Sequence, residues 1–354
     1  MNSGDPQWQP DVLPGYEALT LPLGQDDEGE LVATLVRRAK AGHGDGPAAI
    51  NLLYLHGWCD YFFQTHLADF WESLGVRFHA LDLRKYGRSL RPGQTPGYVT
   101  SLDQYDDDIE AALAVIGEDA PLVLMGHSTG GLVWSTWVPR HPGRAVGLVL
   151  NSPWLEFQAG DVGRKALEVP FRVQAAMAPR SHIVNIDPGF YSRSISNRYD
   201  GEWTVDPAWR PDVTWQATPA WITAVFDAHE AVAHGLHIDI PILVFLSAKF
   251  APPLRWGEDM TRNDTVINVE AVAQRVPWLG DVVTLVRLEG ALHDVTLSAA
   301  PVRERLWAES SRWYRGYIEP EVVSDEPDDE SAETPPPRNW WQRFISGEGL
   351  FAGP

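Results

Sequence analysis

The sequence has little cysteine and no long hydrophobic run. Cys59 is the single cysteine among 354 residues, so no disulfide can form within the chain, and we expect a reducing, cytoplasmic setting. No apolar run approaches the ~20 residues that a membrane-spanning helix needs. Residues 1–16 contain no cationic stretch followed by an apolar one. We therefore expect neither a signal peptide nor stable membrane insertion.

Basic residues are also scarce. The chain has 28 Lys and Arg against 48 Asp and Glu, a formal net charge of −20. Eight of the carboxylates lie in residues 319–333, which contain no Lys or Arg, and this leaves −12 on the rest of the chain. Because that remainder would repel a phosphate backbone, we expect no nucleic-acid partner. The 44% of hydrophobic residues is typical of a globular protein with a sizeable core.

One stretch organises the rest of the chain. Residues 122–125 are an uninterrupted apolar run, followed by Gly126-His-Ser128-Thr-Gly130 and then by the apolar helical pattern Leu132, Val133, Trp137. Gly-x-Ser-x-Gly between a strand and a helix is typical of a nucleophile elbow, in which the serine sits on a sharp turn. The flanking pattern favours this interpretation over a glycine-rich turn with an incidental serine.

Strands and helices are expected to alternate along most of the chain. The expected strands are 31–37, 49–55, 77–82, 122–125, 145–150, 240–246 and 282–288, and the main expected helices are 102–116, 129–139, 269–276 and 297–318. This alternation predicts an α/β fold with a mainly parallel central sheet and helices on both faces.

The alternation also suggests domain boundaries. We expect residues 1–30 to be an irregular N-terminal segment, and residues 31–151 and 237–318 to form the α/β core. Residues 152–236 contain no comparable strand but several tryptophans, which predicts an inserted helical cap. Residues 319–354 are acidic and proline-rich and are expected to be a disordered tail.

Chemistry-bearing residues follow several of the expected strands. Ligands of open α/β sheets bind at the carboxyl ends of the strands. His56, Gly57 and Trp58 follow the first buried strand, Ser128 follows the elbow strand, and His293 follows the last one. A loop rich in acids lies between them, which gives the order serine, acid, histidine. A serine needs a neighbouring imidazole to take its proton, and a carboxylate orients that imidazole.

At this point the chain resembles the α/β-hydrolases, and most of all the monoacylglycerol lipase and lysophospholipase-like group with a serine aminopeptidase domain. The resemblance covers residues 31–317. It depends on these motifs: His56-Gly57, Asp82-Leu83-Arg84 with Gly87-Arg88-Ser89, Gly126-His127-Ser128-Thr129-Gly130, and Gly290 with His293-Asp294. These motifs indicate the fold and a catalytic triad rather than a substrate.

The resemblance implies roles for particular residues. Ser128 would be the nucleophile and His293 the general base, with no cofactor. The backbone N–H groups of Trp58 and Thr129 would form the oxyanion hole. The residues expected to line the substrate site are His56, Gly57 and His127.

The triad acid departs from the family pattern. Members commonly have a Gly-x-x-Asp turn close behind the penultimate strand, whereas here no acid occurs before Glu258 and Asp259. Asp264 stands in Asp-Thr-Val-Ile, which resembles the Asp-x-Val-Val that usually follows the family acid. We therefore predict Asp264 as the acid, with Asp259, Glu258 and Glu156 as the alternatives.

A cluster of histidines suggests a metal, but its spacing argues against one. His229 and His234 are five residues apart, about 140° around a helix, whereas zinc-protease helices place their histidines four apart. We expect no metal site. The predicted function is hydrolysis of an apolar carboxylic ester, such as an acylglycerol or lysophospholipid. The alternatives are a proline-iminopeptidase-like peptidase with the same triad and a catalytically silent binding module.

Overall fold

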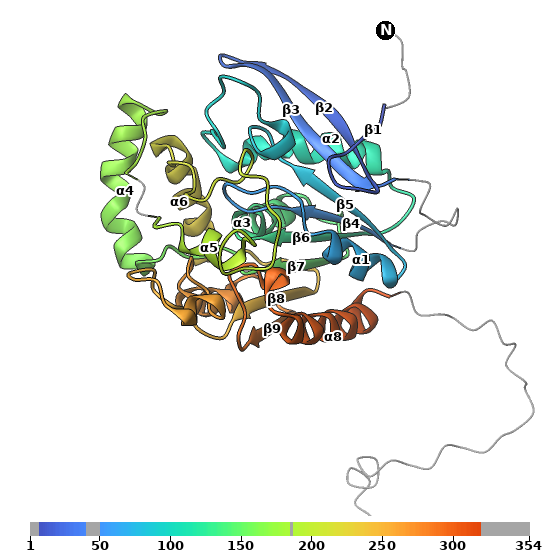
Figure 1. The fold of residues 1–354 in the computed structure, drawn as a ribbon. Helices are drawn as coiled ribbons and strands as arrows, with labels where there is room; N and C mark the ends of the chain where they lie inside the picture. Colours follow the sequence, from blue (N-terminus) through green and yellow to red (C-terminus); the bar gives the residue numbers. More distant parts are fainter. Residues whose placement is uncertain (1–6, 40–49, 185–186, 320–354) are drawn as a thin grey trace, which may run out of the picture. The chain divides into compact units, whose positions relative to one another are not determined.

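A computed structural model describes residues 7–39, 50–184 and 187–319. Within them lies a nine-stranded sheet with the order β1-β2-β3-β5-β4-β6-β7-β8-β9 (Figure 1). Its parallel strands are β4 (Ile50–Leu55), β5 (Val76–Asp82), β6 (Leu122–His127), β7 (Gly147–Asn151), β8 (Ile242–Ser247) and β9 (Val283–Leu288). The predicted mainly parallel α/β fold is confirmed. Apart from Glu319, the predicted acidic tail lies outside the described residues.

The prediction of an irregular segment over residues 1–30 is wrong where the structure describes strands, at residues 9–10, 16–26 and 29–30. β1 (Gln9–Pro10) pairs with β2 (Tyr16–Asp26), and β2 pairs antiparallel with β3 (Gly29–Arg38), which continues the sheet to β5. The side chains of Leu19 and Leu21 alternate into the core with 5% exposure each. Pro22 obscured this alternation, and it lies where the register of the pair shifts, a position at which a strand tolerates proline.

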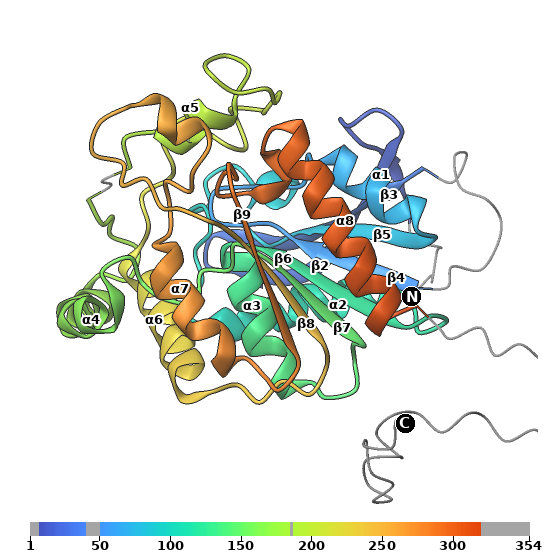
Figure 2. The same cartoon turned by 90° about the horizontal axis from the view of Figure 1, so that it is seen from below.

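Helices cover both faces of the sheet (Figure 2). One face carries α1 (Thr65–Ser73) and α8 (Ala300–Tyr317), and the other carries α2 (Asp106–Ile116), α3 (Thr129–Trp137), α6 (Pro219–His234) and α7 (Val269–Arg275). Alternate residues of one strand supply the two cores: Leu53 and Leu55 face α2 and α3, whereas Leu52 and Tyr54 face α1 and α8. Both faces of the central strands are therefore packed against helices.

The predicted cap begins after β7, but its last helix belongs to the core. α4 (Gly160–Met177) and α5 (Phe190–Ile195) stand apart from the sheet, whereas α6 packs on α3 and buries Val225 and Phe226 in the main core. The physical reason is topological. β7 and β8 are parallel neighbours, so the chain must cross back over the sheet between them, and α6 is the crossover helix.

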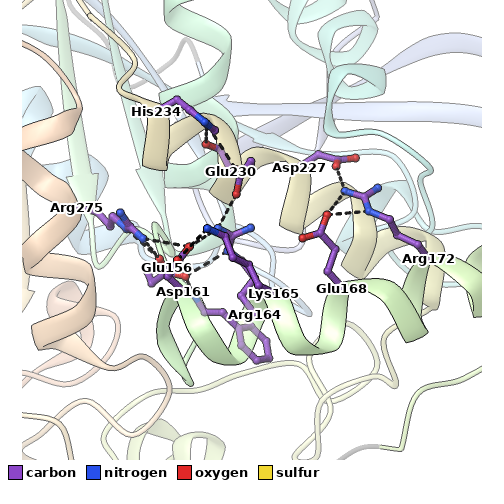
Figure 3. A network of polar contacts seen from close by, with 11 residues as sticks. Glu156, Asp161, Arg164, Lys165, Glu168, Arg172, Asp227, Glu230, His234 and Arg275 are labelled. Carbon is purple, nitrogen blue, oxygen red and sulfur yellow. Dashed lines mark hydrogen bonds and ion pairs between the residues drawn. The ribbon is translucent and has the colours of Figure 1, made fainter.

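Charged residues attach α4 to α6 (Figure 3). The side chain of Arg164 is fully buried, and its Nη2 lies 2.7 Å from carboxylate oxygens of both Asp161 and Glu230. Two turns further along α4, Arg172 bonds Glu168 and also reaches Asp227 on α6. The face of α4 that meets α6 thus combines these charged residues with Phe171, whose ring lies 6.1 Å from that of Phe226.

The opposite face of α4 is apolar and exposed. It carries Val162, Val169, Val173 and Met177, whose side chains are 82%, 69%, 54% and 81% exposed. Their spacing places them along one stripe of the helix. We name these four residues the α4 stripe. In the described ranges no helix is long and apolar enough to cross a membrane.

Candidate active site

Ser128 lies at the corner between β6 and α3. Its backbone has φ 52° and ψ −114°, a conformation that residues other than glycine rarely adopt. The corner is also tightly packed. A Cβ on Gly126 would lie 2.5 Å from the carbonyl oxygen of Gly130, and one on Gly130 would lie 2.5 Å from that of His56. Both elbow glycines are therefore required by close backbone approach.

His293 connects Ser128 with Asp264. Its Nε2 lies 3.0 Å from Ser128 Oγ, and its Nδ1 lies 2.8 Å from Asp264 Oδ2. Because the carboxylate accepts at Nδ1, that nitrogen carries the proton, and Nε2 is free to accept from the serine hydroxyl. All three side chains are buried or nearly so, at 8% exposure or less. The structure thus brings together the three residues that the sequence singled out.

Asp264 is fixed on both sides of its carboxylate. Its Oδ1 accepts the backbone N–H groups of Val266 at 2.7 Å and Ile267 at 2.9 Å, which leaves Oδ2 for His293. Its backbone bridges to the segment that follows β8, since the Asp264 carbonyl accepts the Ala251 N–H at 2.7 Å. Residues 252–263 are therefore an excursion that starts and ends just beyond β8, and Asp264 stands where the chain returns to the Phe250–Ala251 segment.

The alternative acids lie elsewhere. Glu258 and Asp259 are exposed on the excursion, and Glu258 pairs with Arg262 at 2.7 Å. Glu156 is buried but bonds Arg275 at 2.9 Å, within the network of Figure 3. Of the four candidates, the hydrogen bond to His293 belongs to Asp264.

Two backbone N–H groups lie on either side of the serine. Thr129 is the first residue of α3. Trp58 follows Gly57, and Gly57 packs against the serine so closely that a Cβ added to it would lie 3.1 Å from Ser128 Cβ. Within the described ranges neither N–H has a hydrogen-bond acceptor in the protein. Two such donors beside the Ser128 hydroxyl are what the predicted oxyanion hole requires.

His56 and His127 form hydrogen bonds with backbone groups of the loops around Ser128. His56 Nε2 accepts the N–H of Leu83 at 3.1 Å, so its Nδ1 carries the proton and donates to the Gly57 carbonyl at 2.8 Å. His127 Nδ1 lies 3.2 Å from the Asn151 carbonyl oxygen, and burial lowers the His127 pKa to about 4. Both rings are at most 2% exposed. These hydrogen bonds fix the neighbouring loops, and the substrate contacts of the two histidines stay a prediction.

Asn151 is a residue of the site that no sequence motif predicted. Its carbonyl accepts the Ser128 N–H at 3.0 Å, and its side chain donates to Asp294 at 2.7 Å and accepts the Val295 N–H at 3.1 Å. It therefore joins the elbow to the loop that carries His293. Its position at the end of β7 was a usable signal, because site residues gather at strand ends.

Aromatic rings surround the loop that carries Trp58. Its indole lies 3.9 Å from that of Trp221 between centroids, and edge-on to Trp215 and Tyr86 at 6.1 and 5.9 Å. Cys59, the next residue, is 1% exposed, and burial raises its pKa to about 12. A thiol in that state is inert, which leaves Ser128 as the nucleophile candidate in this region.

The histidine cluster is not assembled as a metal site. The described part of the chain contains no group of three or more His, Cys, Asp or Glu arranged to hold a metal. His229 is buried, and its Nε2 lies 2.7 Å from the Trp154 carbonyl oxygen, whereas His234 is exposed on α6.

The fold and this geometry define an α/β-hydrolase. The sequence model of the serine aminopeptidase, S33, family matches residues 46–249, and the chain belongs to that family. The predicted resemblance is confirmed.

Curated relatives and solved structures agree with this class. The chain is 34% identical over 134 residues to the phospholipase YtpA of Bacillus subtilis, which is 35% of this chain and 50% of that protein. It is 27% identical over 142 residues to a monoacylglycerol lipase of Mycolicibacterium smegmatis, 39% of this chain and 49% of that protein. The matches thus span about half the length of these relatives.

Solved structures match over more of the chain. The Paleococcus ferrophilus monoacylglycerol lipase has a TM-score of 0.56 at 20% identity, covering 77% of this chain and 96% of that one. A soluble variant of the Saccharomyces cerevisiae monoglyceride lipase has a TM-score of 0.56 at 15% identity, covering 89% and 97%. At these identities the likeness shows the shared fold.

Proposed function

We propose that this protein is a serine ester hydrolase that cleaves apolar carboxylic esters through an acyl-enzyme on Ser128. The observation that carries the proposal is the continuous hydrogen-bonded chain from Ser128 Oγ through His293 to Asp264, with distances of 3.0 and 2.8 Å. Such a chain moves a proton from the serine as its oxygen attacks a carbonyl carbon. The relatives named as lipases and phospholipase support the same class of reaction.

The reaction would proceed in two halves. Ser128 Oγ attacks the ester carbonyl while His293 Nε2 takes its proton, and the N–H groups of Trp58 and Thr129 stabilise the oxyanion. The tetrahedral intermediate collapses, His293 gives the proton to the leaving alkoxide, and an alcohol departs. Water then repeats the sequence on the acyl-enzyme and releases the acid. Asp264 stabilises the imidazolium in both halves.

Two features support an apolar substrate. The aromatic cluster around Trp58 offers a low-polarity wall beside the oxyanion loop, which suits an acyl chain better than a charged group. The α4 stripe exposes apolar side chains on the cap, where an aggregated lipid would cover them. An acylglycerol or a lysophospholipid combines an ester with such a chain. The cytoplasmic location stays a prediction.

Labelling by a fluorophosphonate probe tests the proposal. We expect the wild-type chain to be labelled, Ser128→Ala to lose labelling and ester hydrolysis, and Ser135→Ala to keep both. Ser135 is the matched control, since it is a buried serine on α3 whose hydroxyl bonds the Gly131 carbonyl at 2.7 Å. Undiminished labelling of Ser128→Ala would end the assignment. An unlabelled wild-type chain would favour a silent binding module.

A substrate series separates the two enzymatic alternatives. We expect p-nitrophenyl esters of medium or long acyl chains to be cleaved faster than acetate esters and faster than aminoacyl amides. Faster turnover of the amides would instead favour the peptidase.

A further inference from the structure

We propose that Tyr191, on the cap helix α5, is a positioning residue for His293. The inference rests on the proposed function, in which His293 is the general base. Tyr191 makes two contacts with the loop that carries His293. Its hydroxyl accepts the backbone N–H of Asp294 at 3.2 Å, and its ring packs edge to face against the imidazole, with centroids 5.3 Å apart and planes at 83°.

A triad histidine has to hold two hydrogen bonds at once, to Ser128 and to Asp264. A small rotation or shift of the imidazole lengthens one of them, so the backbone of its loop must be fixed. The Tyr191 hydroxyl binds the first N–H after His293, and the ring of Tyr191 opposes rotation of the imidazole. One side chain thus restrains both the backbone and the ring.

The sheet and the cap fix the histidine loop from two sides. On the side of the sheet, the carboxylate of Asp294 accepts Asn151 Nδ2 at 2.7 Å and Gln64 Nε2 at 3.0 Å. On the side of the cap, Tyr191 binds the backbone N–H of the same residue, and Trp203 Nε1 donates to the Leu297 carbonyl at 2.7 Å. The cap therefore holds backbone groups of the histidine loop that the sheet side does not contact.

Tyr191 is itself restrained by a buried ion pair. The guanidinium of Arg210 lies over the Tyr191 ring, 4.9 Å from its centroid, and Arg210 Nε donates to Asp60 Oδ1 at 3.1 Å. The side chains of Arg210 and Asp60 are 6% and 4% exposed. Burying such a pair contributes little net stability. It does fix the positions of the two side chains, because separating them would leave an unpaired buried charge, which is strongly destabilising. The pair joins the cap to the loop behind Trp58.

Helix α5 also contacts the segment that leads to the acid. Trp256, on the excursion between β8 and Asp264, packs edge to face on Phe190 at 5.6 Å, and the Arg193 guanidinium lies 4.1 Å from its ring centroid. α5 thus packs against both the histidine loop and the excursion that ends at Asp264.

The chain contains a matched control for the hydroxyl of Tyr191. Tyr61, in the core, accepts the backbone N–H of Asp206, in the cap, at 3.0 Å. Both tyrosine hydroxyls therefore accept one backbone N–H across the boundary between cap and core, but only that of Tyr191 reaches the histidine loop. Tyr191→Phe and Tyr61→Phe remove the same kind of bond without creating a cavity.

The experiment compares the two variants in ester hydrolysis, in the rate of fluorophosphonate labelling and in thermal unfolding. We expect both to lower Tm by a similar small amount. Tyr191→Phe should lower kcat and the labelling rate by about 10-fold with KM unchanged, because the chemical step depends on the position of the imidazole. Tyr61→Phe should leave both rates unchanged. Tyr191→Leu, which also removes the ring, should lose more activity than Tyr191→Phe.

Two results would overturn the proposal: equal rates for Tyr191→Phe and Tyr61→Phe, or a change confined to KM. The phenylalanine pair decides the matter even where Tyr191→Leu fails to fold. Failure of the proposed function looks different, since Ser128→Ala would then keep its label. Loss of label in Ser128→Ala, together with equal rates for the two phenylalanine variants, would remove the role of Tyr191 alone.

Discussion

The backbone at Ser128 is held in a conformation that costs about 1–3 kcal/mol and persists only where its surroundings enforce it. Here φ is 52°, and the enforcing contacts are the two elbow glycines and the bond from the Ser128 N–H to the Asn151 carbonyl. The strain directs the hydroxyl toward His293. The fold thus stabilises an unfavourable backbone at the one residue where the proposed chemistry needs it.

At the same scale, the acid assignment predicts the effect of one isosteric change. Asp264→Asn should lower the acylation rate by roughly 10²–10⁴ with the fold retained, because the amide cannot stabilise the imidazolium and favours the wrong tautomer of His293. Single-turnover release of p-nitrophenol measures this rate. Glu258→Gln and Asp259→Asn, on the exposed excursion, are the controls and should react like the wild type. Near-normal acylation by Asp264→Asn would refute the assignment.

The sequence allowed Ser128, His293 and Asp264 to be singled out, but not Tyr191. The first three stand in motifs or at strand ends, where residue type and position both carry information. Tyr191 lies in a segment without a motif, and its hydrogen-bond partner Asp294 is 103 residues away in the sequence. Its role follows from how the cap packs on the core, which no local pattern encodes.

At the scale of elements, the late position of Asp264 has a structural explanation. The bridge between Phe250 and Asp264 closes the excursion of residues 252–263, so Asp264 lies beside the segment that directly follows β8. A local sequence pattern predicts β8 and the apolar residues after Asp264. It does not predict the bridge between Phe250 and Asp264, since these two residues meet only in the folded chain. The same holds for β2, whose pairing with β3 outweighs the weak strand propensity of Pro22 and Gly24.

From the exposed α4 stripe we predict that charges on α4 change the hydrolysis rate of aggregated substrates but not that of dissolved ones. Val169→Glu/Val173→Glu places two charges on the α4 stripe, and we expect several-fold slower hydrolysis of an emulsified long-chain ester because the charges must be desolvated at an apolar surface. Hydrolysis of a water-soluble short ester should be unchanged. Initial rates on both substrates check the prediction.

The matched control changes two exposed valines at the amino ends of strands, away from the strand ends at which Ser128 lies. Val146 and Val282, 39% and 43% exposed, precede β7 and β9. Val146→Glu/Val282→Glu should hydrolyse both substrates like the wild type. If this control slows emulsion hydrolysis as much as the α4 variant does, added negative charge rather than the α4 stripe is responsible.

At the scale of the whole molecule, buried neutral histidines make the fold sensitive to acid. Burial lowers the pKa of His79 and of His229 to about 3. An unfolded histidine titrates at its ordinary pKa near 6.5, so the unfolded state takes up protons that the folded state refuses. The stabilising contribution is complete above about pH 6.5 and falls as the pH falls, by about 1.4 kcal/mol per pH unit for each histidine.

Denaturant unfolding at a series of pH values between about 7 and 4 tests this linkage. For His79→Gln, the free energy of unfolding should fall less steeply with acidification than for the wild type, by about one proton in the slope. His234→Gln is the control, because the His234 side chain is 74% exposed. Parallel curves for His79→Gln and the wild type would show that His79 is not the buried neutral group described above.

The single cysteine gives this molecule a practical property in labelling chemistry. Cys59 is 1% exposed, and its thiol pKa is raised to about 12, so maleimides and other thiol reagents have no reactive target in the described body of the native chain. A cysteine introduced at an exposed position of the cap, such as Val173, would be modified selectively without removing a native one. A fluorophore or spin label placed there would report movement of α4 against the sheet.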